Sequence, residues 1–268
     1  MWAVRNILYG AIFGVANVIP GVSGGTMAVI LNIYDRLMEA LSFKNLKKHL
    51  WFLITLAIGA AAGIFAFSNA ITYLLEHFPI ATNFAFIGLI VGSLPMVFKR
   101  AGGTKPRVST ILCFAAGLAV MIGMGFLPQE ETGGAVMTQL TVGNFFFLLI
   151  VSAVSAFAMI LPGISGSLVM VIFGAYSTVI GAITDLNILV LVPVAIGCLV
   201  GIVFGSKLVS TLMKRFTEPT YAAILGLIVG SLFTIFPGFS FDWQGAAAVS
   251  LLVVGAAVAY LFSVKQTD

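Results

Sequence analysis

Charge is the scarcest property of this chain. Only 8% of its 268 residues are charged, whereas 60% are apolar, and the mean hydropathy is +1.15. Soluble domains carry about a quarter charged residues, so this chain cannot cover a water-facing surface. It also lacks a long basic run, and its net charge is only +4, which argues against a nucleic-acid partner. The composition therefore predicts an integral membrane protein.

Cysteine and histidine are scarce as well. The chain has two of each, Cys113, Cys198, His49 and His77, and they lie in separate segments. A metal site needs more ligands close together than this, and cysteines inside apolar runs are typical of small buried side chains. We therefore expect no metal, no disulfide and no cofactor. No pattern in the sequence defines an oligomeric state.

Long apolar runs are abundant. Six of them are long enough to cross the roughly 30 Å hydrocarbon core of a bilayer as helices. They cover residues 51–75, 83–98, 108–127, 188–213, 220–236 and 245–263. Two further runs, about 6–34 and 144–176, are interrupted by the dipeptides Pro20-Gly21 and Pro162-Gly163. The sequence thus predicts an all-α polytopic membrane protein.

The second half of the chain repeats the first. The stretch GLIVGSL at 88–94 recurs letter for letter at 226–232, an offset of 138. The interrupted segments match at an offset of 142, which places Tyr34 on Tyr176. We therefore expect two repeats within one membrane domain, 1–138 and 139–268, each with one interrupted segment and three spanning helices. Duplicated halves of this kind are common in transporters.

The positions of the charges predict the course of the interrupted segments. Each arm of the first segment has about 12 residues, so it reaches roughly 18 Å, about half of the core. If both segments re-enter and the N-terminus is cytoplasmic, all 13 Lys and Arg residues lie inside. If both span instead, Lys214 and Arg215 move outside, against the positive-inside rule. We expect two re-entrant hairpins and cytoplasmic termini. Because three spans follow each hairpin, the repeats are expected to be inverted.

The tips of the two hairpins are the expected binding site. Small polar residues follow each Pro-Gly break, where the first amides of a new helix lack partners and favour an anion. We expect the tips to meet near the midplane and bind an anionic head group. The alternative is that the small residues only allow close packing. The candidates are Asn17, Pro20, Gly21, Ser23, Gly24, Gly25, Thr26, Pro162, Gly163, Ser165, Gly166 and Ser167.

A few other polar residues are candidates for supporting roles. Lys207 is either a counter-charge for the anion or a side chain that reaches the cytoplasmic interface. Gating or coupling roles are considered for a group near the ends of the hairpins. The alternative for this group is an ordinary solvated helix end with an i,i+3 ion pair. Its members are Tyr34, Asp35, Arg36, Glu39 and Tyr176.

The paired stretches NVIPGVSGGTMAVILNIYDRLMEAL at 17–41 and MILPGISGS at 159–167 resemble the polyprenyl-phosphate transporter family. The resemblance covers nearly the whole chain. It implies a multi-pass flippase of the bacterial inner membrane. Such a protein returns undecaprenyl phosphate, the lipid carrier of peptidoglycan precursors, from the outer to the inner leaflet. One departure is Ser177, where the family is expected to carry an acidic residue.

The resemblance also raises the question of an energy source. Moving one negative charge inward against an inside-negative potential costs about 2.3 kcal/mol per 100 mV. Net import therefore calls for a co-transported proton or sodium ion, or for a protonated phosphate. The candidate coupling residues are Asp35, Glu39 and Glu76.

Two other functions use similar tips. A carrier of a small soluble anion would need the same backbone donors. Polyprenyl-diphosphate phosphatases also have inverted repeats, re-entrant hairpins and Pro-Gly-x-Ser motifs, but Gly24 or Gly166 stands where that family carries Arg. Neither tip supplies the His or Glu that phosphoryl transfer requires. We therefore expect a transporter and not an enzyme.

Overall fold

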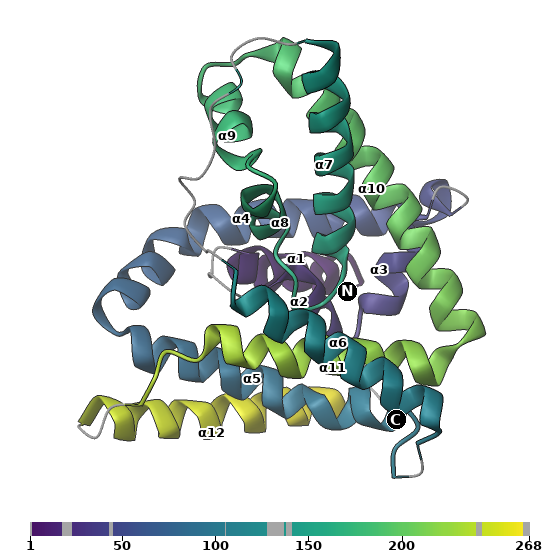
Figure 1. Ribbon diagram of the computed structural model, residues 1–268. Coiled ribbons are helices and arrows are strands. Elements are labelled where there is room, and N and C mark those ends of the chain that lie inside the picture. The colour runs from purple at the N-terminus through teal and green to yellow at the C-terminus, as the bar shows by residue number, and fades with distance from the viewer. Residues whose placement is uncertain are drawn as a thin grey trace.

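The computed structural model is helical throughout its described secondary structure (Figure 1). It describes residues 2–17, 23–42, 45–104, 106–127, 137, 141–239 and 243–264. In chain order the helices are α1 (Trp2–Asn17), α2 (Gly24–Ile30), α3 (Tyr34–Leu41), α4 (Leu46–His77), α5 (Pro79–Arg100), α6 (Val108–Gly125), α7 (Val142–Ile160), α8 (Gly166–Ile172), α9 (Tyr176–Thr184), α10 (Ile188–Arg215), α11 (Thr217–Ile235) and α12 (Trp243–Val264).

Seven of the described helices are long and apolar enough to cross a membrane. Six of them, α4, α5, α6, α10, α11 and α12, are the predicted spanning runs, with ends that shift by up to five residues. The seventh is α7, the first arm of the second interrupted segment. With 19 residues it is longer than the half-span expected for such an arm. The all-α, multi-pass membrane fold is confirmed.

The second arm of each hairpin is broken a second time, which the sequence analysis did not predict. The arm expected to end at Tyr34 stops at Ile30 instead, and Tyr34 starts α3. Between them Asn32 has φ 54°, and its counterpart Gly174 between α8 and α9 has φ 70°. Asn and Gly adopt this left-handed conformation at the least cost, and it ends a helix. The bend between α8 and α9 is 112°.

Glycines bring α1 and α4 into close contact. A Cβ on Gly59 would lie 2.1 Å from the Ile7 carbonyl oxygen, and one on Gly63 would lie 2.3 Å from the Ala11 carbonyl oxygen. Only glycine allows two helix backbones to approach this closely. Contact positions rise together along the two helices, so α1 and α4 are parallel. The chain between them must therefore turn back toward the side from which α1 started.

The same crossing recurs in the second half. A Cβ on Gly197 would lie 2.3 Å from the Leu149 carbonyl oxygen, and one on Gly201 would lie 2.2 Å from the Ala153 carbonyl oxygen. Helices α7 and α10 are therefore parallel as well, and Figure 1 shows them side by side. Gly197 follows the α4 residue Gly59 by the repeat offset of 138, so the sequence repeat corresponds to a repeated helix pair.

The remaining long helices pair across the halves, α5 with α12 and α6 with α11. A Cβ on Gly88 would lie 2.2 Å from the Leu252 carbonyl oxygen, and one on Gly226 would lie 2.1 Å from that of Phe114. The first glycine of each GLIVGSL copy therefore serves helix packing. One turn farther along, Gly92 lies against Ala256 and Gly230 against Leu118, so the second span of each half runs parallel to the third span of the other. Opposite insertion of the halves stays a prediction, which this parallel pairing supports.

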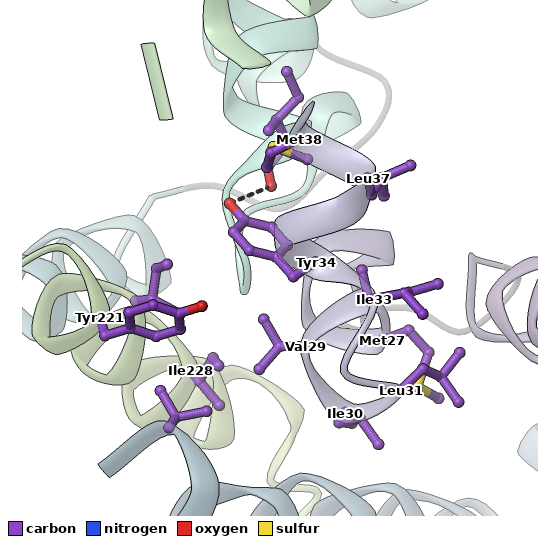
Figure 2. Close-up of a cluster of buried hydrophobic side chains, with 14 of the residues drawn as sticks. Met27, Val29, Ile30, Leu31, Ile33, Tyr34, Leu37, Met38, Tyr221 and Ile228 are labelled. Carbon is purple, nitrogen blue, oxygen red and sulfur yellow. Dashed lines mark hydrogen bonds between the residues drawn. The ribbon is translucent and has the colours of Figure 1, made fainter. Parts of the chain in front are cut away.

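The two hairpins are not equally enclosed. All seven residues of α2 are buried, whereas α8 buries only Gly166 and Val169. Helix α2 packs against α5 and α7, and α3 packs against α4 and α10, so the first hairpin contacts both halves. Figure 2 shows Val29 of α2 on the side that faces Ile228 and Tyr221 of α11. Helices α8 and α9 pack on α7 and α10, within their own half.

Candidate functional site

The two hairpins meet at their tips. The backbone N–H of Gly163 donates to Ser23 Oγ and to Thr26 Oγ1, both at 2.8 Å. Ser23 is also the N-cap of α2, because its Oγ accepts from the Thr26 N–H at 3.1 Å. Tyr34 adds a third link, since its hydroxyl donates to the Ile160 carbonyl at 3.2 Å. Residues about 140 positions apart therefore form one contact.

This contact is tight and buried. Ser23 is 5% exposed and Thr26 is 1% exposed. A Cβ on Gly25 would lie 2.8 Å from the Ile160 carbonyl oxygen and 3.0 Å from the Pro162 nitrogen. The small residues of the first tip therefore allow close packing, which was the alternative to an anion site, and the anion site itself stays a prediction. In this arrangement their partner is the other hairpin, so a ligand reaches them only when the hairpins separate.

The start of the second arm is more open. Ser165 occupies the N-cap position of α8 but makes no capping hydrogen bond. Its Oγ lies 2.8 Å from the Oγ of Ser167, which is exposed. Gly166 is buried, and its carbonyl accepts from the Ser155 hydroxyl. The second arm thus presents two hydroxyls to its surroundings while the first arm presents none.

The other predicted site residues are placed elsewhere or lie outside the described part of the chain. Pro20 and Gly21 lie outside the described residues, as does the side chain of Asn17. Lys207 is exposed on α10, and its two alternative roles stay predictions. Tyr176 starts α9 and is half-buried.

A polar cluster holds α3 against the spanning helices. The Arg100 Nη1 of α5 lies 2.7 Å from Asp35 Oδ2, and the Tyr221 hydroxyl of α11 donates to Asp35 Oδ1. Arg100 also donates to Tyr221 and, at 3.1 Å, to Asn32 Oδ1. The predicted gating residue Asp35 therefore binds two helices from different halves. Charge-assisted hydrogen bonds of this kind are stronger than neutral ones.

A second ion pair lies farther along α3. Lys214 Nζ of α10 is 2.9 Å from Glu39 Oε1. The hydrogen bond from Lys214 is the largest cause that lowers the pKa of the Glu39 carboxyl below its ordinary value. The ion pair is therefore present at neutral pH and is lost as pH falls through that lowered pKa.

The two ion pairs of α3 border a cavity, and they are weak enough to break. The cavity measures about 300 Å³ and is lined by Asp35, Glu39, Arg100, Ser210, Met213, Lys214, Thr217 and Tyr221. The side chains of both ion pairs are between 34% and 65% exposed. Exposed pairs contribute roughly 0.2–1 kcal/mol each, so they bias α3 toward this position without locking it. Arg36 points elsewhere, and its guanidinium lies 4.1 Å from the centre of the Phe52 ring.

Sequence reasoning missed Arg100, Tyr221 and Asn32 as members of the polar cluster and Lys214 as the partner of Glu39. It used Arg100 and Lys214 only as markers of the cytoplasmic side. Asp35 is 65 residues from Arg100 and 186 from Tyr221, and no periodic pattern relates them. The available signal was that both basic residues end a spanning helix, close to where an acidic hairpin end would return.

The comparisons with known proteins agree on one family. The undecaprenyl phosphate translocase-like (VCA0040-like) family model matches residues 13–251. The chain is 33% identical to a polyprenyl-phosphate transporter of Staphylococcus aureus over 244 residues, which are 87% of this chain and 86% of that protein. It is 32% identical to a polyprenyl-phosphate transporter of Vibrio cholerae over 250 residues, 87% of this chain and 78% of that protein. No solved structure matches. The chain belongs to the undecaprenyl phosphate translocase-like family.

Proposed function

We propose that this protein is a flippase that moves polyprenyl phosphate, undecaprenyl phosphate in particular, from the outer to the inner leaflet of the bacterial inner membrane. Both relatives named above are called polyprenyl-phosphate transporters, which supports this substrate and a non-enzymatic role. The structural observation that carries the proposal is the contact of Gly163 with Ser23 and Thr26, a polar junction between two hairpins. Such a junction can open toward one side at a time.

The unequal packing of the two hairpins supports a resting state that is closed toward the cytoplasm. The first hairpin is held by Asp35 and Glu39 against α5, α10 and α11, and its end is cytoplasmic by the positive-inside rule. The second hairpin packs within its own half and presents Ser165 and Ser167. A phosphate head group then approaches from the outer leaflet at α8, while the prenyl chain stays in lipid. Separation of the tips admits the head group, and release of α3 opens the inner side.

Release of α3 also frees donors that suit a phosphate. Arg100 and Tyr221 bind the Asp35 carboxylate in the closed arrangement, and an incoming phosphate presents oxygens of the same kind. Import of the anion against the membrane potential calls for a proton or sodium ion. The carboxylates of Asp35 and Glu39 are the groups near this path that such an ion would neutralise.

Exchange between leaflets tests the proposal directly. We expect proteoliposomes to expose fluorescently labelled polyprenyl phosphate to a membrane-impermeant quencher at least tenfold faster than protein-free liposomes. A pH or sodium gradient should change the steady-state distribution. Equal rates in both preparations would refute a flippase. Transport of free inorganic phosphate instead would favour the small-anion carrier, and phosphate release from undecaprenyl diphosphate would favour the phosphatase.

A further inference from the structure

An apolar groove lies between α5, α6 and α11, apart from the polar contacts described above. It measures about 590 Å³, and its lining includes Phe98, Ala101, Pro106, Thr110, Ile111, Ala222 and Leu225. The lining runs from the turn between α5 and α6 toward the middle of these helices. The turn lies on the cytoplasmic side in the predicted topology, so the groove enters the inner leaflet from that side.

The repeat shows why this groove is open. Adding 138 to a residue number in the first half gives the equivalent residue in the second half. Equivalent residues of α5 and α11 also occupy equivalent places in the structure, because the matching glycines of both helices make the same close contact with a partner helix. The counterpart of the groove residue Ala222 is Phe84, and that of Ala101 is Phe239. These two rings pack against each other with centroids 5.8 Å apart. Phe236 lies at the same distance from Phe84. Aromatic rings thus occupy in one half the place that two alanines leave open in the other.

A buried hydroxyl lies in the wall of the groove. Thr110 is 3% exposed, and its Oγ1 has no hydrogen-bond partner. Its repeat counterpart is Ala248, so close packing does not require a hydroxyl at this position. Buried polar groups normally have partners, and an unpaired one points to a polar group that is absent here.

Two exposed basic residues flank this end of the groove in the chain. Lys99 and Arg107 are next in sequence to the lining residues Phe98 and Pro106. One acidic residue, Glu218, lies beside Gly102 at this turn. An apolar groove with two cations and an unpaired hydroxyl at one end matches an anionic head group on a long hydrocarbon chain.

We infer that this groove binds the head-proximal isoprene units of polyprenyl phosphate on the cytoplasmic side, with the head group at the turn between α5 and α6. The inference rests on the proposed function and adds to it a site that receives the lipid after it has crossed. Ala101 and Ala222 are the residues that determine whether the chain fits. Because Phe84 and Phe239 fill the equivalent place, the outer side lacks the same receptor.

Photolabelling of the intact protein in liposomes tests this site. The probe is a polyprenyl phosphate with a diazirine in the second isoprene unit, and labelled peptides are mapped by mass spectrometry. We expect labelling of groove residues such as Ile111 and Leu225. Ala222→Phe, which copies the residue of the other half, should lower this labelling at least tenfold. Ala66→Phe, which adds the same ring at an exposed position of α4, should change it less than twofold.

Three outcomes would overturn the inference. The first is labelling of the wild-type protein elsewhere but not in the groove. The second is unchanged labelling in Ala222→Phe. The third is equal labelling of the groove by a phosphatidylglycerol that carries a diazirine in its acyl chain. If Ala222→Phe does not fold, the wild-type map and the phosphatidylglycerol comparison still decide. Leaflet exchange is measured in the same liposomes. Exchange without groove labelling overturns this site alone, whereas groove labelling without exchange supports the site and refutes the flippase.

Discussion

Replacing Gly25 by leucine is expected to abolish polyprenyl-phosphate exchange. A Cβ at this position would already lie 2.8 Å from the Ile160 carbonyl oxygen, which is backbone and cannot move aside as a side chain can. The larger side chain therefore forces the two tips apart and breaks the hydrogen bonds from Gly163 to Ser23 and Thr26. Overpacking of this kind typically costs about 1–3 kcal/mol. We expect the exchange rate in liposomes to fall at least tenfold.

A matched variant separates this effect from a general effect of leucine in a helix. Gly123 of α6 has no atom within 4 Å of an added Cβ, so Gly123→Leu should keep at least half of the wild-type rate. Thermal unfolding in detergent shows whether each variant is folded. A folded Gly25→Leu variant with the wild-type exchange rate would show that the junction of the tips is not needed for transport.

Removing the Asp35 carboxylate is expected to open the cytoplasmic side. The Asp35→Ala substitution leaves the half-buried Arg100 and the Tyr221 hydroxyl without their shared acceptor. The exposed Asp35–Arg100 pair contributes about 0.2–1 kcal/mol and the hydrogen bond from Tyr221 about 0.5–1.5 kcal/mol, and 1.4 kcal/mol corresponds to a tenfold change in an equilibrium. A cysteine introduced as Ser210→Cys in the wall of the cavity reports the change. Its reaction with a membrane-impermeant maleimide should become about tenfold faster.

The pairing of Asp35 with Arg100 is tested by a double-mutant cycle on the same reporter. Asp35→Ala and Arg100→Ala should each raise the labelling rate, and the double variant should be little faster than either single variant. Asp185→Ala, at an exposed position after α9, serves as the control and should leave the rate unchanged. Fully additive effects of the two substitutions would show that the ion pair does not hold α3.

Local chemistry explains which parts of this structure the sequence predicted. Proline and glycine change the backbone at their own positions, so the break at 162–163 and the hairpin around it could be predicted from the sequence. The contact of this break with Ser23 and Thr26 was expected because hairpins that enter an inverted pair of halves from opposite sides would meet at their tips. The long spans were visible because their length is set by the thickness of the bilayer.

Features that depend on contacts between distant segments were not visible. Asn32 ends α2 through a left-handed conformation that asparagine permits but does not require. Arg100 was recognised as a cytoplasmic charge, but its partners lie on α3 and α11 and carry no shared pattern. The GLIVGSL copies were read as evidence of duplication, and only the structure shows that their glycines join the halves. The groove is open because Ala222 stands where the other half has Phe84. The effect of this difference on packing can be seen only in the structure.

In the proposed mechanism α3 must leave α10 for the lipid to cross, and a reversible crosslink between the two helices tests whether this movement is needed. Glu39→Cys and Lys214→Cys would be combined in a background with Cys113→Ala and Cys198→Ala, because those two thiols are free. A short cleavable reagent that reacts with two thiols then ties α3 to α10. We expect exchange of labelled polyprenyl phosphate to stop on crosslinking, to return on reduction, and to be unaffected by the reagent in either single-cysteine variant. Full exchange by quantitatively crosslinked protein would show that α3 can stay on α10 during transport.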